Sequence, residues 1–187
     1  MRGRNLLSLG ILCVFVVLLT SFKSKEKGPQ EGDNAPEIVL PTPNGDLLKL
    51  SSLRGHLVLV HFWASWCRTC KEQSHTIDQI YSEFKDKQFT TGSGLIVLNV
   101  SLDNNKNAWL AGISKDGFTA NYNVSDLKNT ESIVMATYNI KYLPENYLID
   151  GNGKIIAGGG AIIDNLQNFI EEELVQKSKR KYSFSHL

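Results

Sequence analysis

The sequence predicts an α/β fold with a mixed central β-sheet flanked by helices and with an N-terminal β-hairpin. Two apolar, β-branched runs, residues 57–63 and 95–100, are separated by an amphipathic stretch, which is typical of a parallel βαβ unit. Two later strand-like runs, 145–149 and 154–157, flank the turn-forming residues 150–153 and indicate an antiparallel hairpin. We therefore expect parallel and antiparallel strands in one sheet.

The remaining elements follow from local patterns. The runs 37–40 and 47–50 are rich in apolar residues and flank Asn44-Gly45, a pair that favours a tight hairpin turn. Residues 66–85 repeat apolar side chains every three to four positions, which predicts a helix with one face against the sheet. Similar patterns predict three further helices, over residues 105–115, 131–138 and 165–176.

Composition limits the classes of function. The chain has 187 residues, of which 42% are hydrophobic and 21% charged, as expected for one globular domain with an additional segment. A formal net charge of +1 gives no basic field, so we expect no nucleic-acid partner. Three cysteines are too few for a disulfide-stapled scaffold, and only Cys67 and Cys70 are spaced as a pair.

The N-terminus has the pattern of an export signal. Arg2 and Arg4 precede an almost continuous apolar run over residues 6–19. No small-x-small cleavage site follows, and the run is near the short end of the roughly 17–25 residues that span a bilayer. Residues 1–22 are therefore predicted to be a cleaved signal peptide or a retained membrane anchor. Both alternatives place the domain outside the cytoplasm, in the periplasm or at the outer face of the membrane.

Composition divides the rest of the chain into three parts. A polar, charged stretch is predicted to be a linker, the globular domain follows, and a basic tail ends the chain. These parts cover residues 23–34, 35–177 and 178–187.

The Cys67-Arg68-Thr69-Cys70 segment lies where the strand 57–63 is followed by the predicted helix. A cysteine at a helix N-terminus has a lowered pKa because the unpaired backbone amides stabilise its thiolate. A second cysteine one turn later can attack the mixed disulfide that the first one forms. The spacing predicts a redox-active pair. No further cofactor and no metal are expected, since the histidines show no ligand spacing.

Two runs, FWASWCRTC at 62–70 and YNIKYLP at 138–144, resemble the thioredoxin superfamily. The similarity is to its exported TlpA/ResA-like branch of thiol–disulfide oxidoreductases and covers roughly residues 33–177. It implies a thioredoxin-like fold in which Pro144 is a cis-proline beside the active-site sulfurs.

The resemblance also implies roles for individual residues. Cys67 would be the exposed nucleophile and Cys70 the buried resolving thiol. Trp66 would shield the site from water, and Leu143 and Pro144 would bind the extended chain of a partner.

The pair of residues between the cysteines departs from the family pattern. Thr69 stands where relatives usually carry proline, and Arg68 precedes it. Both are expected to tune the redox potential. A cation at Arg68 would stabilise the Cys67 thiolate and make the disulfide more oxidising. The alternative is a solvated arginine with little effect.

Two further positions depart from the family. Gln73 stands where relatives have a glutamate, and His61 stands where cytoplasmic thioredoxins have a buried aspartate. We interpret His61 as a candidate proton acceptor for Cys70, because imidazole titrates near neutral pH. The alternative is a neutral histidine of the core.

The predicted function is thiol–disulfide exchange with exported proteins. The resemblance implies a reductant supplied by a membrane electron donor, with the thiols of apocytochrome c as one substrate. The membrane itself would be contacted through residues 1–22 if these are not cleaved. Two alternatives stay open: a thiol peroxidase, although no Pro-x-x-x-Thr-x-x-Cys motif surrounds Cys67, and a metal- or haem-handling chaperone that uses the CxxC as a clamp.

Overall fold

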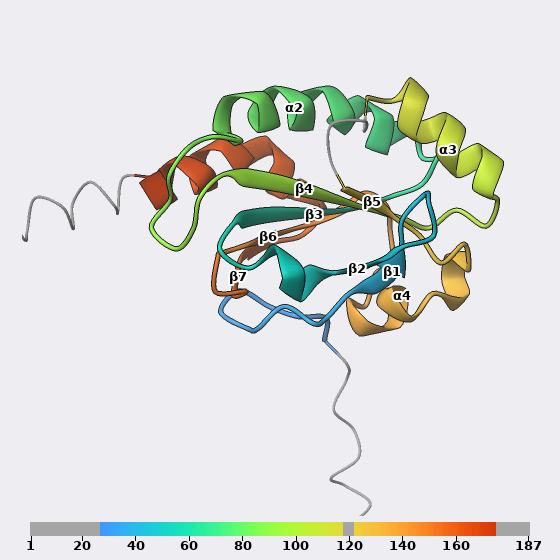
Figure 1. The fold of residues 1–187 in the computed structure, drawn as a ribbon, viewed down its shortest axis with the longest axis horizontal. Helices are drawn as coiled ribbons and strands as arrows, with labels where there is room; N and C mark the ends of the chain where they lie inside the picture. Colours follow the sequence, from blue (N-terminus) through green and yellow to red (C-terminus); the bar gives the residue numbers. More distant parts are fainter. Residues whose placement is uncertain (1–26, 118–121, 175–187) are drawn as a thin grey trace, which may run out of the picture.

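A five-stranded mixed sheet forms the centre of the molecule (Figure 1). The structure, a computed structural model, describes residues 27–117 and 122–174. The strand order is β5-β4-β3-β6-β7; β4 is parallel to β3 and β5, and β6 is antiparallel to β3 and β7. The strands are β3 (Leu57–Trp63), β4 (Leu95–Ser101), β5 (Tyr122–Val124), β6 (Glu145–Ile149) and β7 (Ile155–Gly158). The predicted mixed sheet is confirmed.

The N-terminal hairpin forms a separate two-stranded sheet. Its antiparallel strands are β1 (Val39–Pro41) and β2 (Leu47–Lys49), and the 3-10 turn η1 (Leu50–Leu53) follows. Gly45 closes the turn with φ +95°, a conformation that favours glycine. The hairpin that the Asn-Gly pair predicts is therefore present, with shorter strands than expected.

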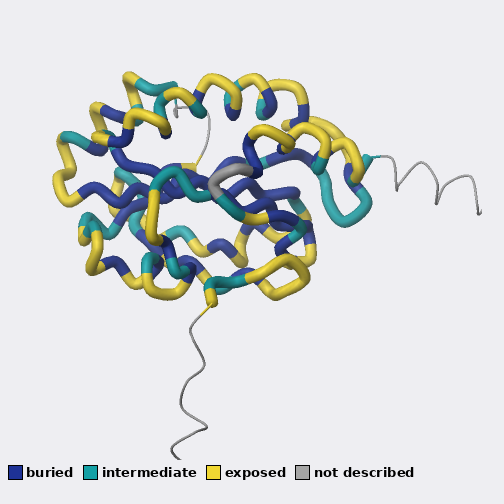
Figure 2. The backbone as a smooth tube through the Cα atoms, turned by 180° about the vertical axis from the view of Figure 1, so that it is seen from behind, coloured by how far each residue is buried: buried dark blue, intermediate teal, exposed yellow. Residues whose placement is uncertain are grey.

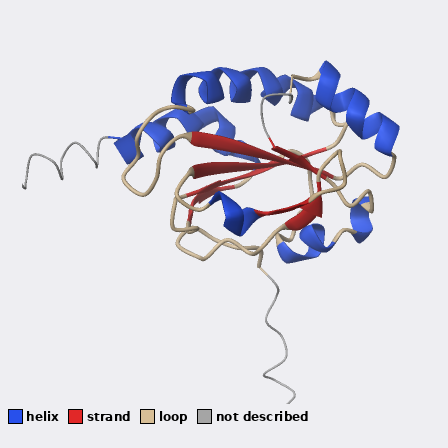
Figure 3. Cartoon of the chain, viewed as in Figure 1, coloured by secondary structure: helices blue, strands red, loops and turns tan. Residues whose placement is uncertain are grey.

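Helices cover both faces of the sheet (Figure 3). The helix α2 and the helix over residues 166–174 lie on one face, whereas the hairpin and α4 lie on the other. The remaining short helical segments connect these elements. The bounds are α2 (Arg68–Phe84), α3 (Lys106–Lys115), η3 (Asn129–Glu131), α4 (Ile133–Thr137) and η4 (Gly160–Asn165).

Two apolar cores lie on the two faces of the sheet, and Figure 2 shows the buried strands between half-exposed helices. Val58, Val60 and Phe62 of β3 point toward the hairpin and α4. Leu57 and Leu59 point toward α2. The side chains of α2 that pack there are those of the predicted stripe: Ile77, Ile80, Phe84 and, partly buried, Tyr81. The period of two along β3 thus separates the cores.

Two features differ from the sequence prediction. The edge strand β5 was not predicted, because the polar sequence Tyr-Asn-Val has no apolar run. Its parallel pairing with β4 and the hydrogen bond from Ser125 N to Pro41 O, 3.0 Å, hold it in place. The C-terminal helix begins at Leu166, one residue after the predicted start, because the 3-10 turn η4 (Gly160–Asn165) directly precedes it.

The predicted segments at the two ends of the chain, residues 1–22 and 178–187, lie outside the described residues. Within 27–117 and 122–174, none of the helices combines the length and the apolar character needed to cross a bilayer. Before the hairpin, Gly32 N donates to Ile155 O at 2.8 Å, so the chain already contacts the domain at this point.

Candidate active site

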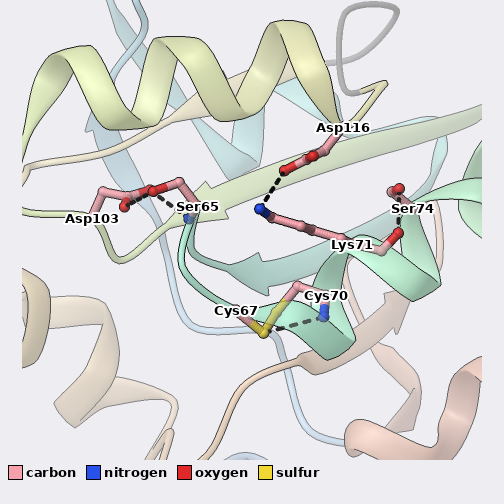
Figure 4. Close-up of polar contacts among 7 residues, drawn as sticks. All are labelled: Ser65, Cys67, Cys70, Lys71, Ser74, Asp103 and Asp116. Atoms are coloured by element: carbon pink, nitrogen blue, oxygen red, sulfur yellow. Dashed lines mark hydrogen bonds and ion pairs between the residues drawn. A yellow bond between two sulfur atoms is a disulfide. The ribbon is translucent and has the colours of Figure 1, made fainter.

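A disulfide joins Cys67 and Cys70 at the N-terminus of α2 (Figure 4). Cys67 is the N-cap residue, and its Sγ accepts a hydrogen bond from Cys70 N at 3.2 Å. Cys67 is 6% exposed and Cys70 is fully buried. A thiolate at Cys67 would accept this hydrogen bond from the Cys70 amide more strongly than a thiol would, since charged acceptors make stronger hydrogen bonds. The site can therefore present one sulfur to a partner and keep the other beneath it.

Apolar side chains surround the pair. Trp63, Ala64 and Trp109 pack with the two cysteines in one buried cluster. Leu143 and other partly buried apolar residues close this cluster from outside. Low solvent access protects a mixed disulfide from competing reactions in water.

Trp66 directly precedes Cys67, and Leu143, the residue before Pro144, packs against the cysteine cluster. The Leu143–Pro144 peptide bond is cis, as the resemblance implies. Trp66 is 64% exposed, so its ring forms part of the surface next to Cys67. A pocket of about 280 Å³ lies between Trp66 and Leu143. Its other apolar lining residues are Leu102, Met135, Ile140 and Tyr142.

The two residues between the cysteines occupy different environments. Arg68 Nε lies 3.2 Å from Glu72 Oε1, and both side chains are exposed. Thr69 Oγ1 lies 3.5 Å from Cys67 Sγ. The charge of Arg68 is thus compensated in part by Glu72, and its effect on the potential stays a prediction. The Thr69 hydroxyl thus contacts the sulfur in addition to the Cys70 amide.

His61 is fully buried in β3. Its Nδ1 lies 2.7 Å from Asn146 Oδ1, and Asn146 Nδ2 donates to Gln73 Oε1 at 3.2 Å. Burial disfavours the charged imidazolium and lowers the pKa of His61 to about 4, although the hydrogen bond with Asn146 acts in the opposite direction. The side chain is therefore neutral near pH 7. A neutral imidazole is compatible with both alternatives from the sequence, a proton acceptor for Cys70 and a histidine of the core, so the catalytic role of His61 stays a prediction.

Asp103 was not identified from the sequence. Its buried carboxylate accepts hydrogen bonds from Ser65 N (3.0 Å), Ser65 Oγ (2.7 Å) and Ser101 Oγ (2.7 Å). Figure 4 shows it beside the loop that leads to Cys67. Ser65 precedes Cys67 by two residues, so Asp103 fixes the path of the active-site loop. Its place just after the buried strand β4 is the signal that sequence reasoning passed over.

A second contact links α2 to the end of α3. Lys71 Nζ lies 4.0 Å from Asp116 Oδ2 (Figure 4). Lys71 directly follows the buried cysteine, and Asp116 is the C-cap residue of α3. The start of α2 is thus attached on one side to the loop after β4 and on the other to α3.

The fold and the disulfide define the class as a thioredoxin-like thiol–disulfide oxidoreductase. Residues 31–157 match the AhpC/TSA family, and this chain belongs to it. The thiol–disulfide oxidoreductase ResA of Bacillus subtilis is 29% identical over 162 residues, which cover 83% of this chain and 84% of that one.

Solved structures give the same result. A thiol–disulfide oxidoreductase from Bacteroides fragilis has a TM-score of 0.62 and 30% identity, and the match covers 73% of this chain and 98% of that chain. The thioredoxin domain of a thiol–disulfide oxidoreductase from Bacteroides vulgatus has a TM-score of 0.64 and 28% identity, covering 75% and 97%. The predicted fold and enzyme class are confirmed.

Proposed function

We propose that this enzyme reduces disulfides of exported proteins outside the cytoplasm. The observation that carries the proposal is the asymmetry of the pair: Cys67 keeps 6% of its surface exposed next to Trp66, which lines an apolar pocket, whereas Cys70 is fully buried. A nucleophile must reach its substrate, whereas a resolving thiol needs to reach only the first sulfur.

The reaction has two exchange steps. In the reduced enzyme the Cys67 thiolate attacks one sulfur of the substrate disulfide, and the other substrate sulfur leaves as a thiolate. The Cys70 thiolate then attacks Cys67 Sγ and releases the second substrate sulfur. The enzyme ends with the Cys67–Cys70 disulfide seen here. A membrane dithiol that reduces this bond would complete the cycle with two electrons.

Leu143 and Pro144 support the docking of an extended substrate segment. Leu143 packs against the cysteine cluster and also lines the pocket beside Trp66. An extended chain along this loop could form strand-like backbone hydrogen bonds while an apolar side chain next to its cysteine enters the pocket.

His61 is proposed as the proton acceptor for Cys70. Burial keeps the imidazole near pH 7 in its neutral form, which is the form that can accept a proton, and the pKa of about 4 makes it a weaker base than a free imidazole. Gln73 has no carboxylate to take this role, so His61 is the titratable group assigned to it.

The location and the physiological substrate follow from the N-terminal sequence and the resemblance. The apolar run after Arg2 and Arg4 supports export, with the domain in the periplasm or at the outer face of the membrane. Apocytochrome c thiols are the substrate that the TlpA/ResA-like branch suggests, and their reduction before haem attachment fits a reductant.

The test is a trap of the mixed disulfide. In the full chain, Cys70→Ser removes the thiol that would break the mixed disulfide between Cys67 and its substrate. Exported proteins should then be recovered as disulfide-linked adducts that dithiothreitol separates. Cys67→Ser is the matched control and should recover none. Adducts confined to cytoplasmic proteins contradict the location, and no adducts contradict the exchange.

A thiol peroxidase is the second candidate, favoured by the Thr69 hydroxyl 3.5 Å from Cys67 Sγ. A hydroxyl there could hydrogen-bond a peroxide oxygen. The reduced enzyme mixed with hydrogen peroxide separates the two candidates: a reductase consumes it no faster than a free thiol does, whereas a peroxidase consumes it orders of magnitude faster.

A further inference from the structure

Buried polar side chains form a row across the central sheet. His61 of β3 pairs in register with Asn99 of β4 and with Asn146 of β6, and all three are fully buried. Polar groups at such positions cost free energy unless they make hydrogen bonds. Two of the three, His61 and Asn146, hydrogen-bond each other, which makes this buried pair a candidate for a function beyond packing.

The row lies under the active-site helix. Leu59 and Trp63 lie two residues before and two residues after His61 on β3. Leu59 is part of the core beneath α2, and Trp63 is part of the cluster around the cysteines. Side chains two residues apart on a strand share a face, so the imidazole of His61 lies on the face that α2 covers. It therefore lies on the side of the sheet where Cys70 is buried.

Asn146 connects this histidine to α2. Its Oδ1 accepts from His61 Nδ1 at 2.7 Å, and its Nδ2 donates to Gln73 Oε1 at 3.2 Å. An amide has one accepting and one donating end, so a donor contact to Gln73 turns the oxygen toward the imidazole. His61 must then carry its proton on Nδ1. Gln73 follows Cys70 by three residues, within one turn of α2.

We propose that Asn146 is a positioning residue that holds His61 in the tautomer protonated at Nδ1, so that Nε2 accepts the proton of Cys70. The proposal rests on the function assigned to His61 above. In the resolving step the Cys70 S–H proton passes to Nε2, and the sulfur electron pair forms the bond to Cys67 Sγ. The bond between Cys67 and the substrate breaks, the substrate sulfur leaves with its electron pair, and the imidazolium then returns its proton to solvent.

The groups around His61 suit this role. Its neighbours on the flanking strands are the uncharged Asn99 and Asn146, and the residue linked through Asn146 on α2 is the uncharged Gln73. Cys70 is the titratable group that α2 buries on this side. The orientation of the Asn146 amide thus sets which nitrogen of the buried His61 carries the proton and which one is basic.

The first test reads the tautomer directly. Long-range proton–nitrogen NMR on the reduced full chain labelled with ¹⁵N-histidine should show His61 protonated at Nδ1. In Asn146→Leu the spectrum should change to a mixture or to the other tautomer. Asn99→Leu is the matched control, because it removes an equally buried neighbour of His61 on the opposite flanking strand and leaves the His61–Asn146 hydrogen bond in place; the tautomer should persist. Gln73→Met removes the other end of the hydrogen-bonded series His61–Asn146–Gln73. This variant should also give a mixture of the two His61 tautomers.

The second test measures the two exchange steps separately with oxidised glutathione. Asn146→Leu should slow the release of the mixed disulfide by about tenfold or more, within the range of general acid–base effects. The attack of Cys67, measured in a Cys70→Ser background, should be unchanged. Asn99→Leu should change neither step, and Gln73→Glu, which still accepts from Asn146, should keep the release rate.

Each contrary outcome has one meaning. His61 protonated at Nε2 in the unchanged protein overturns the positioning role, as does a tautomer that Asn146→Leu and Gln73→Met leave intact. If a variant shifts the His61 tautomer but the mixed disulfide is released at the same rate, His61 is not the proton acceptor that the proposed function assigns.

Discussion

Asp103 acts on the active site at the scale of a single residue. Its carboxylate accepts two hydrogen bonds from the partly buried Ser65 and one from the buried Ser101. A buried donor that loses its acceptor retains a desolvation cost, so one side chain determines how the loop before Cys67 is held. The cysteines supply the chemistry, and Asp103 supplies their placement.

We expect Asp103→Ala to lower the free energy of unfolding by about 2–4 kcal/mol, because it leaves buried donors of Ser65 and Ser101 unpaired. Iodoacetamide should also react more slowly with reduced Cys67 in this variant than in the unchanged protein, because the loop before Cys67 is no longer held in place. Asp103→Asn, which keeps one accepting oxygen, should lose less. Chemical denaturation and iodoacetamide kinetics measure both effects. Asp46→Ala, at an exposed position of the hairpin turn, is the control and should change neither.

His61 makes stability depend on pH. Its pKa is about 4 in the folded chain against an ordinary 6.5, so between these values the unfolded chain binds a proton that the folded chain does not. Stability should therefore fall as the pH decreases from 6.5 to 4, by about 3 kcal/mol from this group. Unfolding measured in His61→Gln should lack this part of the slope. The same slope in the variant and in the parent would show that His61 is not buried in its neutral form.

At the scale of elements, the start of α2 and the loop before β6 enclose the pocket beside the disulfide. Trp66 precedes Cys67 on one side, and Leu143 and Tyr142 lie on the other. Tyr142 is 82% exposed, an unusual position for an aromatic side chain without a partner. The docking proposed above would make this pocket an element of substrate selection.

Trp66→Ala should raise KM about tenfold for a peptide disulfide with an apolar residue beside its cysteine, because it removes about 1–2 kcal/mol of apolar contact. The rate with oxidised glutathione should change little, since this small disulfide does not fill the pocket. Leu47→Ala removes an equally exposed side chain from β2, 66% against 64%, and should affect neither substrate. A parallel loss with both substrates would contradict a docking role for Trp66.

Elements with strong local patterns were predictable, and those held by distant contacts were not. The period of α2 and the apolar runs of β3 and β4 are properties of contiguous residues, so the βαβ unit follows from the sequence. The strand β5 depends on pairing with β4 and on a contact with the hairpin, neither of which leaves a local pattern. Its three residues would be a loop in another context.

At the scale of the whole molecule, the same distinction applies to the site. Cys67 and Cys70 are adjacent in sequence and were predictable from spacing, whereas Asp103 and Asn146 reach the site only through the folded sheet. Register places Asn146 beside His61 across 85 residues of chain. The sequence marks such residues only as polar side chains in or directly after apolar strands, a signal that does not name their partners.

The central claim is that Cys67 attacks a disulfide and Cys70 resolves the product. Full-chain enzyme, reduced and then mixed with a disulfide-bonded protein such as insulin, tests this directly when dithiothreitol regenerates the dithiol. With dithiothreitol present, the unchanged enzyme should accelerate reduction and Cys67→Ser should abolish this acceleration. In a single turnover after dithiothreitol is removed, Cys70→Ser should stop at one stoichiometric mixed disulfide at Cys67. Reduction that survives in Cys67→Ser, or an adduct at Cys70 in the unchanged enzyme, would contradict the account.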